Sequence, residues 1–300
     1  MSHSFPVIGI IGKRDHPSVG ATVAQLATLL DGHARQVIMD QRTAGLLPQW
    51  TGNTADQTEL GQRCDLLIVV GGDGALLNAG RMVAPFGTPL LGVNLGRLGF
   101  MVDVLPDHME DTLDQVLAGS YVRDERLMLS AWVQRRGDAP IGPYPALNEV
   151  TVRNAEFARV LEFDTHLEHG FISRHRADGI IIASPTGSTA YALSGGGPVL
   201  HPGMDALVIV PICPHTLSDR PLVIDAHHRV GITICDGDHS QALFTADGQD
   251  TETLGPGDQV FVERAQTPLT LIHPPGYDYF NILRNKLRWG RGQLKPDAPC

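Results

Sequence analysis

A glycine-rich stretch, Gly71-Gly72-Asp73-Gly74, follows the apolar run of residues 66–70. Apolar residues bounded by turn residues are typical of a buried parallel strand, and glycines let a ligand approach the backbone closely. Open α/β sheets bind ligands at the carboxyl ends of their strands, so we expect the Asp73 carboxylate to face a substrate. On its own, a Gly-Asp-Gly sequence is more often a plain turn.

The charge of a bound phosphate would have to be met without a P-loop lysine, because no G-x-x-x-x-G-K-[ST] sequence occurs. Backbone amides, Mg²⁺ and Arg97 are the groups available for this task. Arg97 is equally compatible with a solvated loop position.

A second stretch, residues 177–198, begins with an acidic turn and a strand and then turns through Pro185 and Gly187 into a predicted short helix of small residues. Hydroxyls and amides at a helix start favour an anionic or ribose-bearing ligand. A Ser/Thr cap with a glycine stop is the alternative interpretation. Capping needs fewer hydroxyls than the four present, which are Ser184, Thr186, Ser188 and Thr189.

The amino-terminal half alternates predicted strands and helices. Alternation of this kind predicts a Rossmann-like parallel sheet with right-handed crossovers. The loops 71–74 and 94–100 should then lie side by side at the mouth of the sheet. The predicted strands are residues 7–11, 37–40, 66–70 and 89–93, and the predicted helices are residues 19–30, 54–63, 76–82 and 107–118.

The carboxyl-terminal half is rich in extended segments with Gly, Asp and Pro turns at short intervals, which predicts a β-rich sandwich. Residues 269–272 are the last of these predicted strands. An amphipathic helix at 279–289 is predicted to pack back on the first domain. We therefore expect an α/β domain at 1–122, a β-rich domain at 123–274 and a returning segment at 275–300.

The composition limits the function classes. With 23 Lys+Arg against 33 Asp+Glu, the net charge of -10 disfavours nucleic acid and anionic membranes as partners. The four cysteines show no disulfide or zinc spacing, and the 13 histidines show no paired ligand spacing, so no protein-built metal site is expected. Without an apolar signal core or a long apolar run, a cytoplasmic location is the default expectation.

Six motifs together closely resemble the bacterial NAD kinases, over residues 65–289. The Gly-Gly-Asp-Gly loop alone is shared with lipid kinases and phosphofructokinases, whereas the 178–198 block and the Asn-Glu pair are specific to NAD kinases. The motifs are GGDG at 71–74, NLGRLGF at 94–100, LNEV at 147–150, DG at 178–179, PTGSTAY at 185–191 and HTLSDRP at 215–221.

The resemblance implies transfer of the terminal phosphate of ATP, or of polyphosphate in some members, to the 2'-hydroxyl of the adenosine ribose of NAD. It implies Mg²⁺ or another divalent cation with ATP. It also implies a homodimer or homotetramer in which a neighbouring subunit helps to complete the NAD site. Choice between ATP and polyphosphate, between NAD and NADH, and between dimer and tetramer stays open.

Site residues follow from the same resemblance. Asp73 matches the acid that contacts the reacting hydroxyl and is assigned as general base, although shaping the turn or holding Mg²⁺ stays open for it. The phosphate-loop and adenine-side positions are Gly72, Gly74 and Phe100. The nicotinamide-side positions are Asn148, Glu149 and Asp178, and Arg176 stands where some members carry an arginine that affects the choice between NAD and NADH. The adenosine pocket and a late Asp-Gly-Gln turn contribute Thr186, Thr189, Ala190, Tyr191, Ser194, Asp247 and Gln249.

One departure from the family pattern and two competing functions are noted. Ala75 stands where many relatives carry Thr, which removes a hydroxyl beside the glycine loop. A lipid or sugar kinase of the glycine-loop superfamily is the competing enzyme. A catalytically idle dinucleotide-binding regulator is the competing non-enzyme.

Overall fold

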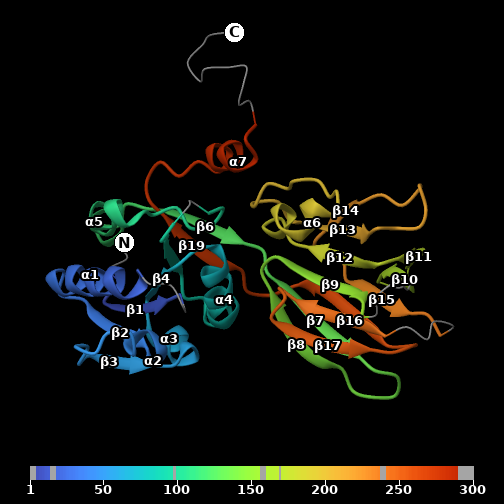
Figure 1. The fold of residues 1–300 in the computed structure, drawn as a ribbon, viewed down its shortest axis with the longest axis horizontal. Coiled ribbons are helices and arrows are strands. Elements are labelled where there is room, and N and C mark those ends of the chain that lie inside the picture. Colours follow the sequence, from blue (N-terminus) through green and yellow to red (C-terminus); the bar gives the residue numbers. More distant parts are fainter. Residues whose placement is uncertain are drawn as a thin grey trace, which may run out of the picture. The chain divides into compact units, whose positions relative to one another are not determined.

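The computed structural model describes residues 5–13, 18–96, 99–155, 160–168, 170–236 and 241–289. The chain divides into two compact units (Figure 1). Unit 1 is Met1–Asp124 with Thr270–Cys300, and unit 2 is Glu125–Leu269. Arg97 falls outside the described residues, so the structure gives no information on its predicted role.

Unit 1 contains a seven-stranded sheet in the order β3-β2-β1-β4-β5-β19-β6. The pairings β1–β2, β1–β4, β2–β3, β4–β5 and β5–β19 are parallel, as the alternation of strands and helices predicts. The strands are β1 (Val7–Gly12), β2 (Gln36–Asp40), β3 (Asn53–Ala55), β4 (Leu66–Val70), β5 (Leu90–Val93), β6 (Val122–Arg126) and β19 (Leu269–His273).

Helices cover both faces of this sheet. The side chains of Ile8 and Ile10 join a core with helices α1 and α5, whereas the α-carbon of Gly9, between them, faces Leu60 of α3. The helices are α1 (Val19–Gly32), α2 (Gln41–Ala44), α3 (Gln57–Arg63), α4 (Asp73–Val83), α5 (Met109–Leu117) and α7 (Tyr279–Leu287). Short 3₁₀ turns occur at Ala84–Phe86 and Pro106–His108.

The predicted helix at 54–63 begins too early. Residues Asn53–Ala55 form β3, because they pair with β2 at the edge of the sheet. Asp56 then caps α3 by accepting the Glu59 N–H, and the Glu59 side chain accepts the Asp56 N–H in return.

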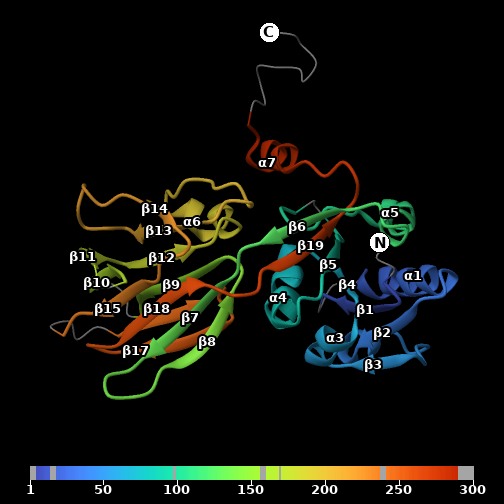
Figure 2. The same cartoon turned by 180° about the vertical axis from the view of Figure 1, so that it is seen from behind.

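Strand β19 joins the sheet of unit 1, although sequence reasoning grouped it with the β-rich half. Leu271 and Ile272 pair in parallel with Leu90 and Leu91 of β5. Figure 2 shows β19 between β5 and β6. The chain therefore leaves this sheet after β6, builds unit 2, and returns to complete it.

Unit 2 is a sandwich of two six-stranded antiparallel sheets, as predicted. Their orders are β11-β10-β15-β18-β7-β8 and β14-β13-β12-β9-β16-β17, and both contribute to one apolar core. The strands are β7 (Leu129–Gln134), β8 (Ile141–Ala146), β9 (Glu149–Asn154), β10 (Leu161–Leu167), β11 (Gly170–Ala177), β12 (Gly179–Ala183), β13 (Ala206–Ile212), β14 (Leu222–Asp225), β15 (Val230–Ile234), β16 (Ala242–Ala246), β17 (Asp250–Leu254) and β18 (Gln259–Arg264).

The last helix, α7, buries Tyr279, Ile282 and Leu283 within unit 1 and is capped by the Asp278 carboxylate. It ends two residues before the predicted limit, at Leu287. Among the described residues, no helix is long and apolar enough to span a membrane.

Truncation of Phe163 tests the sandwich core. Phe163 lies on β10 with 0% of its surface exposed. We expect Phe163→Ala to lower the free energy of unfolding by about 3–5 kcal/mol in urea denaturation, because it leaves a buried cavity. Phe171→Ala is the matched control, since Phe171 on the adjacent β11 is 60% exposed. Equal losses in the two variants would contradict this account of the core.

Candidate active site

The glycine loop lies where open α/β sheets bind ligands. Strand β4 lies beside β1, whereas the chain after β1 continues to β2 on the other side, so a topological switch point falls between β1 and β4. The loop follows β4 and opens helix α4. It is joined to the end of β5, where the Gly71 N–H donates to the Val93 carbonyl at 2.8 Å. The predicted adjacency of the 71–74 and 94–100 loops is therefore confirmed.

The three glycines of the loop differ in how much space surrounds the position of a Cβ atom. A Cβ on Gly71 would come within 2.6 Å of the Ala75 Cβ, so packing excludes a side chain there. Gly72 and Gly74 have open space where a Cβ would stand, and neither has a left-handed φ. Nothing in the described structure thus requires glycine at those two positions, whereas close approach of a ligand would.

Asp73 is the first residue of α4, and its carboxylate is held by three successive backbone amides. Oδ2 accepts the Phe100 N–H at 2.8 Å, and Oδ1 accepts the N–H groups of Met101 at 3.0 Å and Val102 at 3.2 Å. A carboxylate offers about four lone-pair positions, so these three amides leave about one position for a further donor.

Gly99 is required by this arrangement. A Cβ on Gly99 would overlap Oδ1 of Asp73. The next residue, Phe100, is half-buried, and its ring has the Lys286 ammonium of α7 at 6.0 Å from the centroid. The structure thus brings together Gly72, Asp73, Gly74 and Phe100 of the predicted residues in unit 1.

The Asn148-Glu149 pair in unit 2 is held by a second carboxylate. Oδ2 of Asp247 accepts the Leu147 N–H at 2.7 Å, and Oδ1 accepts those of Asn148 at 2.9 Å and Glu149 at 3.0 Å. Asp247 and Gly248 have φ values of 51° and 65°, as in the type I′ turns that join β-hairpins. The Asp247 carboxylate therefore positions Asn148 and Glu149 through their backbone N–H groups. The neighbouring Gln249 is exposed.

Glu149 has an unusual environment for a carboxyl group. Burial, followed by the nearby Asp247 charge, raises the pKa of Glu149 to about 7, and the backbone N–H of Tyr191 opposes the rise. Its Oε2 atom is buried with no hydrogen-bond partner in the described structure. Glu149 can thus change its charge near neutral pH, beside the 187–191 segment.

The predicted short helix after Pro185 is confirmed only in part. A 3₁₀ turn at Gly187–Thr189 and a single helical turn at Tyr191–Ser194 are separated at Ala190, whose ψ of -125° is not helical. The close approach of Gly187 to the Asn148 carbonyl leaves no room for a Cβ. This contact joins the segment to the Asn148-Glu149 pair.

Most hydroxyls of this segment are used internally rather than exposed to a ligand. The buried Ser184 donates to the Leu147 carbonyl, and the buried Ser188 donates to Pro185 and accepts the Leu200 N–H at 2.9 Å. The Thr186 hydroxyl accepts from Arg126 at 3.4 Å. Thr189 donates to the Thr186 carbonyl and is half-buried, as is Ala190, whereas Tyr191 and Ser194 are exposed.

Arg176 and Asp178 flank the end of β11. Both side chains are exposed, and Arg176 Nε lies 3.9 Å from Glu162 Oε1. The Arg176 carbonyl accepts the His215 N–H at 2.8 Å, which connects β11 to the HTLSDRP motif. These two residues belong to unit 2, like the rest of the predicted nicotinamide side.

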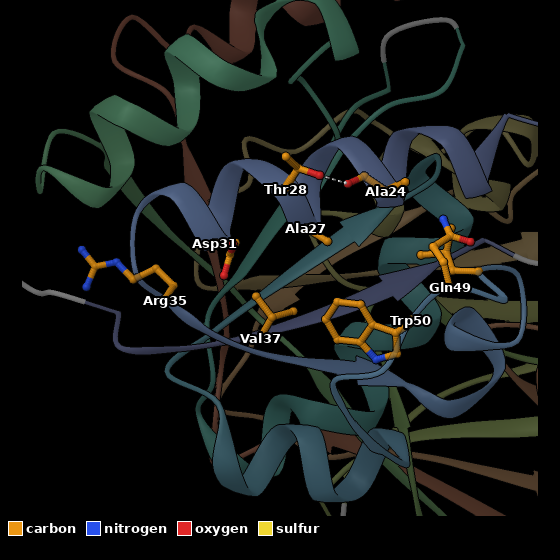
Figure 3. Close-up of a pocket in the computed structure, with 9 residues that line it drawn as sticks. Ala24, Ala27, Thr28, Asp31, Arg35, Val37, Gln49 and Trp50 are labelled. Atoms are coloured by element: carbon orange, nitrogen blue, oxygen red, sulfur yellow. Dashed lines mark hydrogen bonds between the residues drawn. The ribbon is translucent and has the colours of Figure 1, made fainter.

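A separate cavity of about 390 Å³ lies in unit 1 between α1 and the segment around Trp50 (Figure 3). Its walls include Ala27 of α1, Val37 of β2 and the Trp50 ring. None of the residues predicted for the site lines it.

Comparisons with known proteins agree with this arrangement. Residues 8–121 match the family described as the ATP-NAD kinase N-terminal domain, and residues 147–274 match the ATP-NAD kinase C-terminal domain. An NAD kinase from Nitrosococcus oceani is 44% identical over 97% of this chain and 99% of that protein. One from Teredinibacter turnerae is 41% identical over 95% of this chain and 97% of that protein.

Two solved structures share the fold. Yeast NADH kinase complexed with NADH gives a TM-score of 0.88 at 23% identity, covering 99% of this chain and 91% of the yeast chain. An Archaeoglobus fulgidus NAD kinase in complex with ATP gives a TM-score of 0.73 at 24% identity, covering 94% of this chain and 98% of the Archaeoglobus chain. The fold class is that of a two-domain nucleotide kinase. The chain belongs to the NAD kinase family, which confirms the resemblance seen in the sequence.

Neutralising Glu149 tests its environment. A carboxyl pKa raised in the folded protein means that folding takes up protons between about pH 4.5 and 7, so the free energy of unfolding falls as pH rises through this window. We expect Glu149→Gln to be more stable than wild type at pH 8, by at most about 3 kcal/mol, and comparable near pH 4.5.

Thermal melts from pH 4.5 to 8 measure this difference. Glu263→Gln, on β18 of the same unit, is the matched control and should follow the wild-type pH dependence. A Glu149→Gln variant that gains no stability at high pH would contradict the raised pKa.

Proposed function

We propose that this chain, an NAD kinase, transfers the terminal phosphate of ATP to the 2'-hydroxyl of the adenosine ribose of NAD with Asp73 at the reacting hydroxyl. The observation that carries the proposal is the glycine loop. Gly72 and Gly74 leave open backbone on either side of a carboxylate that keeps about one free acceptor position. That position can accept the hydroxyl proton while the loop meets the phosphates.

The residues of unit 1 supply position and electrostatics rather than covalent chemistry. Phosphoryl transfer depends mainly on alignment and on neutralising charge. The glycine loop opens the 11-residue helix α4, whose N-terminal amides favour an anion. Asp73 is fixed by the 100–102 amides, so its free lone pair has a defined direction.

A divalent cation fits this chain as a companion of ATP. The described residues contain no group of three or more His, Cys, Asp or Glu side chains that could hold a metal ion. Mg²⁺ is commonly bound by one or two carboxylates together with substrate phosphates, and it would neutralise phosphate charge here. Because the remaining acceptor position of Asp73 is assigned to the hydroxyl, the cation would be held mainly by the substrate phosphates and water.

Residues of unit 2 hold NAD in this proposal. Asn148 and Glu149 bind the nicotinamide ribose, with Asp247 fixing their backbone, and Glu149 is able to donate or accept because its pKa is near 7. Arg176 and Asp178 lie on the nicotinamide side. Thr186, Thr189, Ala190, Tyr191 and Ser194 form the adenosine side, with Gln249 nearby in the Asp247 turn. The proposal also includes assembly of the chain into a homodimer or homotetramer and a location in the cytoplasm.

Incubation of the purified protein with NAD, ATP and Mg²⁺ tests the function through the appearance of NADP. Parallel reactions with polyphosphate as donor and NADH as acceptor define specificity. Phosphorylation of a lipid or sugar instead of NAD would support the competing kinase. Dinucleotide binding without any product would support the idle regulator.

The Gly74→Ala variant tests whether the glycine loop binds the phosphates of ATP without disturbing the fold. Nothing lies within 4 Å of the added Cβ, and the residue is in the first turn of α4. We expect unchanged or slightly higher stability, by up to about 1 kcal/mol, because alanine is the better helix former. Phosphates approaching the loop would meet the new methyl group, so the KM for ATP should rise at least about tenfold, which corresponds to about 1.4 kcal/mol.

Melting temperatures and the KM values for ATP and NAD measure this outcome. Gly71→Ala serves as the contrast, since its Cβ clashes with Ala75 and should lower stability. An unchanged KM for ATP and unchanged kcat in Gly74→Ala would count against a phosphate loop.

Asp73→Asn removes the proton acceptor. The asparagine oxygen can still accept amide bonds on one side, whereas its NH₂ group meets the amides on the other, so a modest drop in melting temperature is expected. With NAD affinity retained, kcat should fall about 100- to 10,000-fold, the usual contribution of a positioned acid or base. Steady-state kinetics and NAD titration measure both quantities. Near-normal turnover would remove Asp73 from the mechanism.

A further inference from the structure

The segment 100–102, whose amides bind the Asp73 carboxylate, is followed by an aspartate that contacts a buried histidine. Asp103 directly follows the three amide donors Phe100, Met101 and Val102. Its Oδ2 atom lies 3.0 Å from Nδ1 of His273, at the end of β19. All of these groups belong to unit 1.

The segment around Asp103 is buried and bonded to the sheet. Val102 and Val104, on either side, are 0% and 2% exposed. The Val104 carbonyl accepts the Asn94 N–H at 2.7 Å, and Val104 pairs with Val93 of β5. Asp103 thus lies between two buried residues, and its carboxylate contacts His273.

His273 is immobilised in its surroundings. Its side chain is 1% exposed, and its ring stacks on the Tyr277 ring with centroids 3.8 Å apart and planes 9° apart. On its other edge, Nε2 lies 3.5 Å from Oδ2 of Asp124 on β6. Because β19 pairs with β5, the imidazole belongs to the sheet whose strand ends carry the glycine loop.

We propose that His273 is a positioning residue for phosphoryl transfer, because its Nδ1–H bond to Asp103 fixes the 100–102 amides that orient the Asp73 carboxylate. Hydrogen bonds to a carboxylate in a buried site are strong and directional. A shift of about 1 Å in a positioned catalytic group can cost about 100-fold in rate. This role rests on the proposed function of Asp73.

Two amide replacements at His273 distinguish the roles of its two ring nitrogens. His273→Asn places an NH₂ donor close to the Nδ1 position, facing Asp103, whereas His273→Gln places one close to the Nε2 position, facing Asp124. We expect His273→Gln to lower kcat about 10- to 100-fold, with KM values for NAD and ATP within about threefold of wild type. His273→Asn should recover most of that loss.

Asp124→Asn is the control at the other nitrogen and should leave kcat within about threefold of wild type, because it changes the group that faces Nε2 and keeps the Nδ1 contact with Asp103. A purely structural histidine would give Asn and Gln variants with equal kcat per folded molecule. That result, with folded fractions taken from melting curves, would overturn the proposal.

Asp103→Ala keeps the test decisive even where a His273 variant folds poorly. Its kcat loss should match that of His273→Gln, and the double variant should lose no more than either single variant. Independent, multiplicative losses would overturn the proposal. Failure of wild type to make NADP would instead refute the proposed function, so the two failures are distinguishable.

Discussion

The structure depends at two places on one interaction, a carboxylate that accepts three successive backbone N–H groups. Asp73 is held by the 100–102 amides in unit 1, and Asp247 by the 147–149 amides in unit 2. Successive amides that point the same way form a concave site for an anion, and here a side chain occupies that site. In unit 1 the bonds fix the direction of the carboxylate beside the glycine loop. In unit 2 they orient the backbone that carries Asn148 and Glu149.

The sequence predicts the scaffold of unit 1 well because its signals are local. The run Leu66–Val70 is buried throughout, and the helix spacing of α1 matches its buried residues Val19, Val23, Leu26 and Leu30. Strand β19 was grouped with unit 2 because its partner β5 lies about 180 residues earlier in the chain. Periodicity reports that a segment is extended, but it carries no information about a distant pairing partner.

The sequence shows which residue types stand at the predicted site, but it does not show their hydrogen-bond partners. The hydroxyl-rich stretch around Pro185 was recognised as unusual, yet Ser184 and Ser188 bond to Leu147 and Leu200, which lie elsewhere in the chain. The Asp-Gly hairpin was recognised as a turn, whereas the amides it binds are about 100 residues away. Open space at Gly72 and Gly74 likewise becomes visible only when the neighbouring atoms are placed.

The return of the chain through β19 gives the protein an order of assembly during synthesis. Residues of the first sheet emerge early from the ribosome, but His273 and the strand that carries it emerge only after the whole β-rich unit. Until then Asp103 lacks its imidazole partner, and β5 has an open edge where β19 will pair. Domains generally fold as units while the chain is being made. The β-rich unit therefore has the opportunity to fold as an insert before the first sheet closes, so the contact between Asp103 and His273 is among the last to form.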